Sequence, residues 1–193
     1  MVKKITNQPQ TADRRPQTKI TITKETPTEE ILKLSPACRC EKCEHGCTVG
    51  SGIFLDHEII PLAKFLNISE EELKEKHLEK IEKFNTTKYR PKTNKGWFKK
   101  YGKCTFYDEK KGCTIHPVKP FECKISSGCN GNGEDIIAWF NLNHFVNEND
   151  PESVRQYAQY VKAGGKIIPG SELEKLVPDK KKREAILKYK LLR

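Results

Sequence analysis

The chain has 193 residues, of which 35% are hydrophobic and 32% are charged, and its formal net charge is +10. This length supports one domain with a modest hydrophobic core. Residues 1–10 lack the apolar segment of a secretory signal peptide, and no run of about 18 apolar residues occurs, so we expect no membrane span and a cytoplasmic location.

Composition divides the chain into three regions. Residues 1–34 are basic and mostly lack periodicity, so we expect an extended or disordered N-terminal arm, which could bind another protein. Residues 35–130 contain every cysteine and are expected to form a metal-binding domain. Residues 131–193 show helical patterns and are expected to pack on it. The predicted fold is a small, mainly α domain organised around a cysteine-ligated metal centre, with irregular loops and C-terminal helices.

Helix signals occur at several places along the chain. Pro61 is compatible with the first turn of a helix over 58–66. Ser69 begins a capping box, and the apolar spacing after it predicts a helix that continues to residue 85. Residues 86–103 are then expected to form a long loop. Further helices are predicted over 135–147, after the Asp150-Pro151 cap, over 171–177, and after Asp179.

The eight cysteines fall into two groups, which are Cys38, Cys40, Cys43 and Cys47, and then Cys104, Cys113, Cys123 and Cys129. Thiolates are soft ligands, and the Cys40-Glu-Lys-Cys43 spacing lets two of them reach one ion. In a reducing compartment this pattern favours metal binding over disulfides. Gly46, Gly50 and Gly52 would let the backbone turn tightly around a centre. We expect the two groups to share a zinc ion or a 4Fe–4S cluster, and the spacing leaves both open.

Residues 88–111 carry nine Lys or Arg side chains against two acidic ones, with aromatic residues between them. Such a segment can neutralise phosphates and stack on bases, although a solvated surface loop has the same composition. The predicted contacts to RNA or the ribosome are Lys95, Lys99, Lys100 and Lys103 in this segment, and Arg14, Arg15 and Lys19 in the arm.

A second cysteine motif carries a resemblance to a known family. Cys40-x-x-Cys43, Cys104-x-Phe106 and Cys113-Thr-Ile-His-Pro-Val-Lys-Pro-Phe-Glu-Cys123-Lys124 resemble the YkgJ-type cysteine-cluster family of zinc- or iron-chelating proteins, and flagellin lysine methylases carry a related segment. The resemblance covers about residues 36–125 and implies metal binding. The family commonly ends its first motif with adjacent cysteines, whereas Cys47 stands alone here. The ligand candidates are Cys40, Cys43, Cys47, Cys104, Cys113 and Cys123, with Cys38, Cys129 and His116 as secondary candidates.

The leading interpretation is a non-catalytic protein whose metal is structural, so that metal release should unfold residues 36–130. An RNA- or ribosome-associated protein with the metal as scaffold is the alternative. A redox protein or a methyltransferase-related enzyme comes third, because no glycine-rich cofactor loop or acid–base pair accompanies the cysteines.

Overall fold

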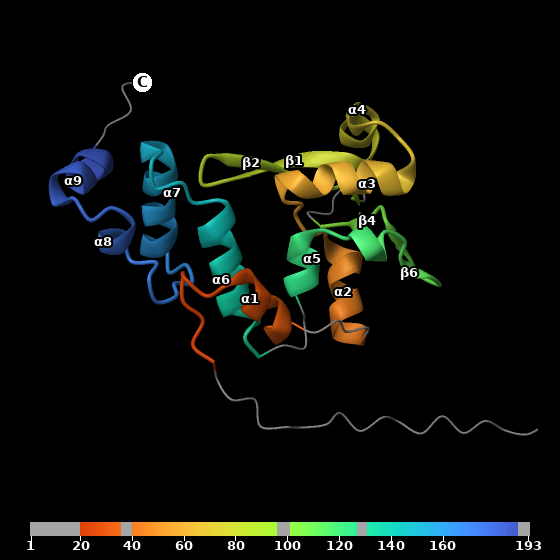
Figure 1. The fold of residues 1–193 in the computed structure, drawn as a ribbon, viewed down its shortest axis with the longest axis horizontal. Helices are drawn as coiled ribbons and strands as arrows, with labels where there is room; N and C mark the ends of the chain where they lie inside the picture. The colour runs from red at the N-terminus through yellow and green to blue at the C-terminus, as the bar shows by residue number, and fades with distance from the viewer. Residues whose placement is uncertain (1–19, 36–39, 96–100, 127–130, 189–193) are drawn as a thin grey trace, which may run out of the picture.

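The computed structural model describes residues 20–35, 40–95, 101–126 and 131–188 (Figure 1). About half of these residues are helical, and the strands are short. No helix within these ranges is long and apolar enough to cross a membrane. The α-helices are α1 (Thr28–Leu34), α2 (Glu41–Val49), α3 (Ile59–Leu66), α4 (Glu70–Glu72), α5 (Phe121–Ile125), α6 (Gly133–His144), α7 (Pro151–Lys162), α8 (Leu173–Leu176) and α9 (Lys180–Lys188).

The strands of the described residues form three separate antiparallel pairs. They are β1 (Leu78–Lys83) with β2 (Thr86–Pro91), β3 (Thr93–Asn94) with β4 (Lys103–Cys104), and β5 (Tyr107–Asp108) with β6 (Gly112–Cys113). Three further helical turns, η1 (Asp56–Glu58), η2 (Leu73–His77) and η3 (His116–Val118), connect these elements.

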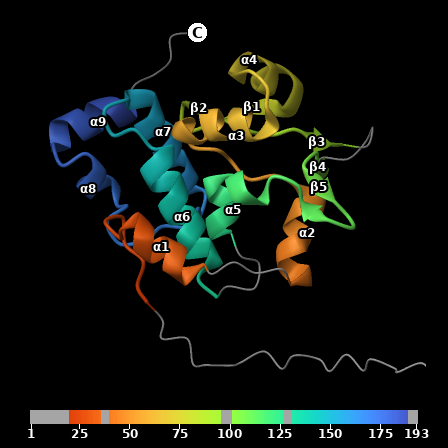
Figure 2. The ribbon, with the colours of Figure 1, turned by 45° about the vertical axis from the view of Figure 1, so that its right-hand side comes forward.

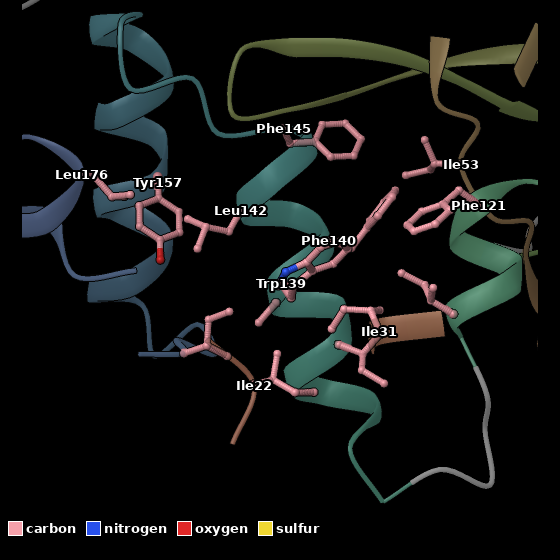
Figure 3. Packing of buried hydrophobic residues seen from close by; sticks show 14 of the residues in the cluster. Ile22, Ile31, Ile53, Phe121, Trp139, Phe140, Leu142, Phe145, Tyr157 and Leu176 are labelled. Carbon is pink, nitrogen blue, oxygen red and sulfur yellow. The ribbon is translucent and has the colours of Figure 1, made fainter. Parts of the chain in front are cut away.

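The larger of two hydrophobic clusters is centred on α6 (Figure 3). Phe140 of α6 packs against Phe121 of α5, and Tyr157 contributes from α7. Ile31 of α1 is fully buried in the same cluster. The C-terminal helices therefore share one core with α1 and with the cysteine-bearing helix α5.

A smaller hydrophobic cluster is formed by residues of α3, the strand pairs and their neighbours. Its buried members include Phe54, Leu62 and Leu73, together with Cys104 and Ile115. This cluster fixes the strand pairs that carry two of the cysteines, while the larger cluster fixes α5. The two clusters thus position the second cysteine group from two sides.

The predicted helix over residues 69–85 is wrong beyond His77. Its start is as expected, because Ser69 Oγ accepts the Glu72 N–H. The chain then makes the π-helical turn η2 and enters the β1–β2 hairpin. Phe84 and Asn85 both have positive φ angles, 48° and 56°, and such a turn joins two antiparallel strands. Residues 86–91, predicted as loop, are consequently strand β2.

The other helix predictions agree with the structure. The Asp150 carboxylate caps α7 by accepting the Glu152 N–H, and Asp179 accepts the Lys182 N–H at the start of α9. Helix α2 was not predicted, since Gly46 was read as a turn. The helix continues through Gly46, and nothing lies within 4 Å of a Cβ built there, so neither a turn nor a close approach requires this glycine.

Residues 20–34, assigned from the sequence to an extended arm, pack on the larger core. Ile22 is only 2% exposed, and the Trp139 indole N–H donates to the Thr26 carbonyl. In both views α1 lies beside α6 (Figures 1 and 2). Residues 1–19 of the predicted arm lie outside the described residues.

Candidate metal centre

Helix α2 presents one face of cysteines. Cys40 is its N-cap, and Cys43, Cys47 and Gly50 follow at helical spacing, while the residues between them are exposed. None of the α2 residues is fully buried. Glu44 and His45 are exposed. A helix normally docks through an apolar stripe, and on α2 cysteines occupy that position.

The second cysteine group comes from three other elements. Cys104 lies in β4, Cys113 in β6 and Cys123 in α5. α2 contacts β4 and lies beside α5 and these strands (Figure 2). Five cysteines line one cavity of about 280 Å³ between these elements, namely Cys43, Cys47, Cys104, Cys113 and Cys123. The structure therefore brings members of both sequence groups to one site.

Cys40 lies next to this cavity. Its Sγ atom is 3.6 Å from Cys43 Sγ. Four sulfurs about 2.3 Å from one zinc ion would be roughly 3.8 Å apart, so this pair has the spacing of two ligands to one metal. Among the described residues, however, no three His, Cys, Asp or Glu side chains converge closely enough to hold an ion. Apart from the Cys40–Cys43 pair, the described sulfurs line the cavity without converging on one ion position.

Backbone N–H groups are already aimed at three of these sulfurs. The Phe106 N–H donates to Cys104, the Ile115 N–H donates to Cys113, and the Gly52 N–H donates to Cys123. In the first two cases the donor is two residues after the cysteine, so the short strand pairs place it. Hydrogen bonds to ligand sulfurs stabilise the thiolate form that binds metals.

Burial has the opposite effect on the same thiols. It raises the pKa of Cys104 to about 11, and it also raises the pKa values of Cys47, Cys113 and Cys123. The positive charge of Lys119 partly offsets this increase in pKa at Cys47 and Cys113. Since burial disfavours thiolates without a nearby cation, metal binding at this site would release protons.

Of the three secondary candidates, the structure describes only His116. His116 lies in η3 and is not one of the cavity-lining residues. Cys38 and Cys129 lie outside the described residues. The chemistry of the six described cysteines, the cavity between them and the N–H groups on three sulfurs fit a zinc ion or an iron–sulfur centre.

The sequence analysis missed one wall residue, Glu122, and predicted another, Gly52, only as a turn residue. Glu122 lines the cavity and its Oε2 accepts the Ile53 N–H at 2.8 Å, and burial raises its pKa. Gly52 lies against Cys123, which is far from it in sequence. Spacing rules find neither residue, because their role depends on the approach of two distant segments.

The predicted nucleic-acid residues are only partly described. Lys95 is exposed and its Nζ lies 3.9 Å from Glu79, and Lys103 Nζ is 3.1 Å from Glu109. Lys88 is 8% exposed and pairs with Asp56, so it belongs to the interior rather than to a basic loop. The remaining predicted contacts, Lys99, Lys100, Arg14, Arg15 and Lys19, lie outside the described residues.

Comparison with known proteins identifies the family of this site. Residues 37–143 match the model of the CxxCxxCC family, described as a "putative zinc- or iron-chelating domain". The match spans more than half of the chain, and the chain therefore belongs to this family. No curated protein and no solved structure matches the chain. The matched residues begin before α2 and end within α6, so they include all the cavity-lining cysteines.

Proposed function

We propose that this protein binds zinc or an iron–sulfur cluster through the cavity cysteines, and that the bound centre has a structural, non-catalytic role. The single observation that carries the proposal is the convergence of five cysteines from four elements, spread over residues 43–123, on one cavity. Such convergence is expected when soft ligands are collected for one centre.

The packing of α2 supports the proposed structural role. Because this helix buries no side chain fully, hydrophobic burial provides little energy to hold it in place. A centre bound to Cys43 and Cys47 on one side and to Cys104, Cys113 and Cys123 on the other would attach α2 to the rest of the domain. Binding requires the sulfurs to move inward, and α2 is the least constrained wall of the cavity.

Metal analysis of variants tests this proposal. Cys43→Ala and Cys123→Ala, each purified without oxygen, should lose most of the bound zinc or iron and become more sensitive to protease. Val49→Ala is the matched control, because Val49 lies on α2 and its side chain is 40% exposed, away from the cysteine face. Full metal content in either cysteine variant would remove that residue from the ligand set. Full content in both would refute the proposal.

We infer RNA or ribosome binding as a second candidate function, since an aromatic side chain is exposed among the lysines. Tyr101 is 65% exposed and lies close in sequence to Lys103, whose strand pairs with Asn94 next to Lys95. Exposed aromatic rings beside lysines are typical of surfaces that stack on unpaired bases.

Salt-dependent binding to single-stranded RNA separates this candidate from a solvated surface. Replacing both Lys95 and Lys103 by Ala should flatten the log–log salt dependence by about 1.4, because each contacted phosphate contributes about 0.7. Lys162→Ala with Lys175→Ala removes the same charge from exposed positions on α7 and α8 and should leave the slope unchanged. Equal slopes for both double variants would exclude Lys95 and Lys103 as contacts to RNA phosphates.

A further inference from the structure

Gly52 approaches Cys123 more closely than any residue with a side chain could. A Cβ atom built at Gly52 would lie 2.5 Å from Cys123 Sγ and 2.9 Å from the Cys123 backbone nitrogen. This approach is what lets the Gly52 N–H donate to the sulfur. The absence of a side chain here therefore has a chemical consequence, because it gives a buried thiol a hydrogen-bond donor.

The segment that carries this donor is held in place by the residue before Cys123. Glu122 Oε2 accepts the Ile53 N–H at 2.8 Å, and the Glu122 N–H donates to the Ile53 carbonyl at 3.4 Å. Ile53 itself is 1% exposed in the larger core. Two adjacent residues of one segment, Gly52 and Ile53, are thus paired with two adjacent residues of α5, Glu122 and Cys123.

We propose that Gly52 and Glu122 are positioning residues of the metal centre, which set the affinity and the ligand field of the metal through the Cys123 sulfur. Gly52 supplies the N–H that stabilises the Cys123 thiolate. Glu122 holds Ile53 in place through its hydrogen bonds, and this keeps the neighbouring Gly52 N–H directed at Cys123 Sγ. The inference rests on the proposed function, since it concerns the same cavity, and it adds two residues that no cysteine motif contains.

Cobalt(II) titration of the full-length, reduced chain tests the inference, with Co²⁺ as the probe. Sulfur-to-cobalt charge-transfer absorption reports thiolate ligation, and the ligand-field bands report the geometry of the site. Gly52→Ala should weaken Co²⁺ binding by about tenfold or more, which is typical of a lost partner of a ligand, and should shift the ligand-field bands. Gly46→Ala is the matched control, because Gly46 lines the same cavity but has open space for a Cβ, and it should bind like the wild type.

Glu122 variants supply a test that does not depend on the crowded Gly52 position. Glu122→Ala should weaken Co²⁺ binding by about tenfold and shift the same bands. Glu122→Gln should bind close to wild type, because its amide oxygen still accepts the Ile53 N–H. Far-ultraviolet circular dichroism of each variant checks that the fold is retained.

The possible outcomes separate the inference from the proposed function. If wild-type protein shows no thiolate–cobalt absorption, the proposed function fails and the inference fails with it. If the wild type binds cobalt but Gly52→Ala and Glu122→Ala behave like Gly46→Ala, only the positioning role is overturned. A Glu122→Gln variant as weak as Glu122→Ala would also overturn it, because the acceptor would not be what matters.

Discussion

The His144 side chain lies in an aromatic cage at the end of α6. Its ring contacts Phe121, Trp139 and Phe140, and its Nε2 is buried with no hydrogen-bond partner among the described residues. Burial, followed by the charges of Lys88 and His57, lowers the pKa of His144 to about 4, and Glu58 acts in the opposite direction. The folded protein therefore keeps this imidazole neutral.

This pKa predicts a loss of stability in mild acid. An unfolded histidine takes up a proton near pH 6.5, whereas folded His144 does so only near pH 4, so stability should fall as the pH decreases between these values. Because the ring is partly exposed, we expect the free energy of unfolding to fall by only about 1–2 kcal/mol over this range. His144→Leu should remove this part of the pH dependence, measured by denaturant unfolding of both proteins in the same metal state. If the free energy of unfolding of the wild type and of His144→Leu changed equally between pH 7 and pH 4.5, the prediction would be contradicted.

For individual residues, the sequence could identify the cysteines but not the residues that surround them. Thiol chemistry and the Cys40-x-x-Cys43 spacing are local properties, so they are readable from the chain. The contacts of Gly52 and Glu122 with Cys123 and Ile53 depend on tertiary packing. No local pattern distinguishes this glycine from Gly46, which has open space around it.

Among the elements, we expect α2 to depend most on the proposed metal centre. From the sequence we expected metal release to unfold residues 36–130. The structure narrows this expectation, because Ile53, Phe121 and Ile125 belong to the larger core and have apolar partners that do not involve the metal. α2 has no fully buried residue, so the free energy of metal binding should be felt mainly there.

Hydrogen exchange measured with and without a chelator checks this prediction. Removal of the metal should raise exchange rates in α2 strongly and leave those of α6 and α7 near their original values, since both helices lie in the larger core. Slow exchange in α2 after complete metal removal would show that the helix is held without the metal. Loss of protection across α6 would show that the whole domain depends on it.

The elements also show where sequence patterns were insufficient. Leu73, His77, Ile81 and Phe84 have helical spacing, yet only the first two belong to a helical turn and Ile81 lies in β1. The left-handed Phe84–Asn85 turn and the pairing of β1 with β2 outweigh the helical pattern. The capped helices α7 and α9 were predictable, because their caps are local hydrogen bonds.

At the scale of the whole molecule, the N-terminal segment closes the larger core. Ile22 is 2% exposed there, whereas Ile20, two residues earlier, is 47% exposed. The Lys24 N–H donates to the Pro169 carbonyl, which ties the segment to the loop before α8. The first residues of the described chain therefore belong to the domain.

A pair of alanine variants tests this closure. Ile22→Ala should lower the free energy of unfolding by about 2–4 kcal/mol, the usual cost of truncating a buried isoleucine. Ile20→Ala should change it by less than about 0.5 kcal/mol, as exposed positions do. Denaturant unfolding of both variants measures the difference, and equal effects would place Ile22 outside the core.

In the proposed function one metal centre joins the two cysteine groups, and X-ray absorption at the metal tests this proposal most directly. Protein purified without oxygen should show sulfur neighbours at about 2.3 Å from its zinc or iron. In the Cys43→Ala and Cys123→Ala variants the number of sulfur neighbours, or the metal itself, should be lost. A wild-type spectrum with only nitrogen or oxygen neighbours at about 2.0–2.2 Å would contradict the assignment of the cavity cysteines as ligands.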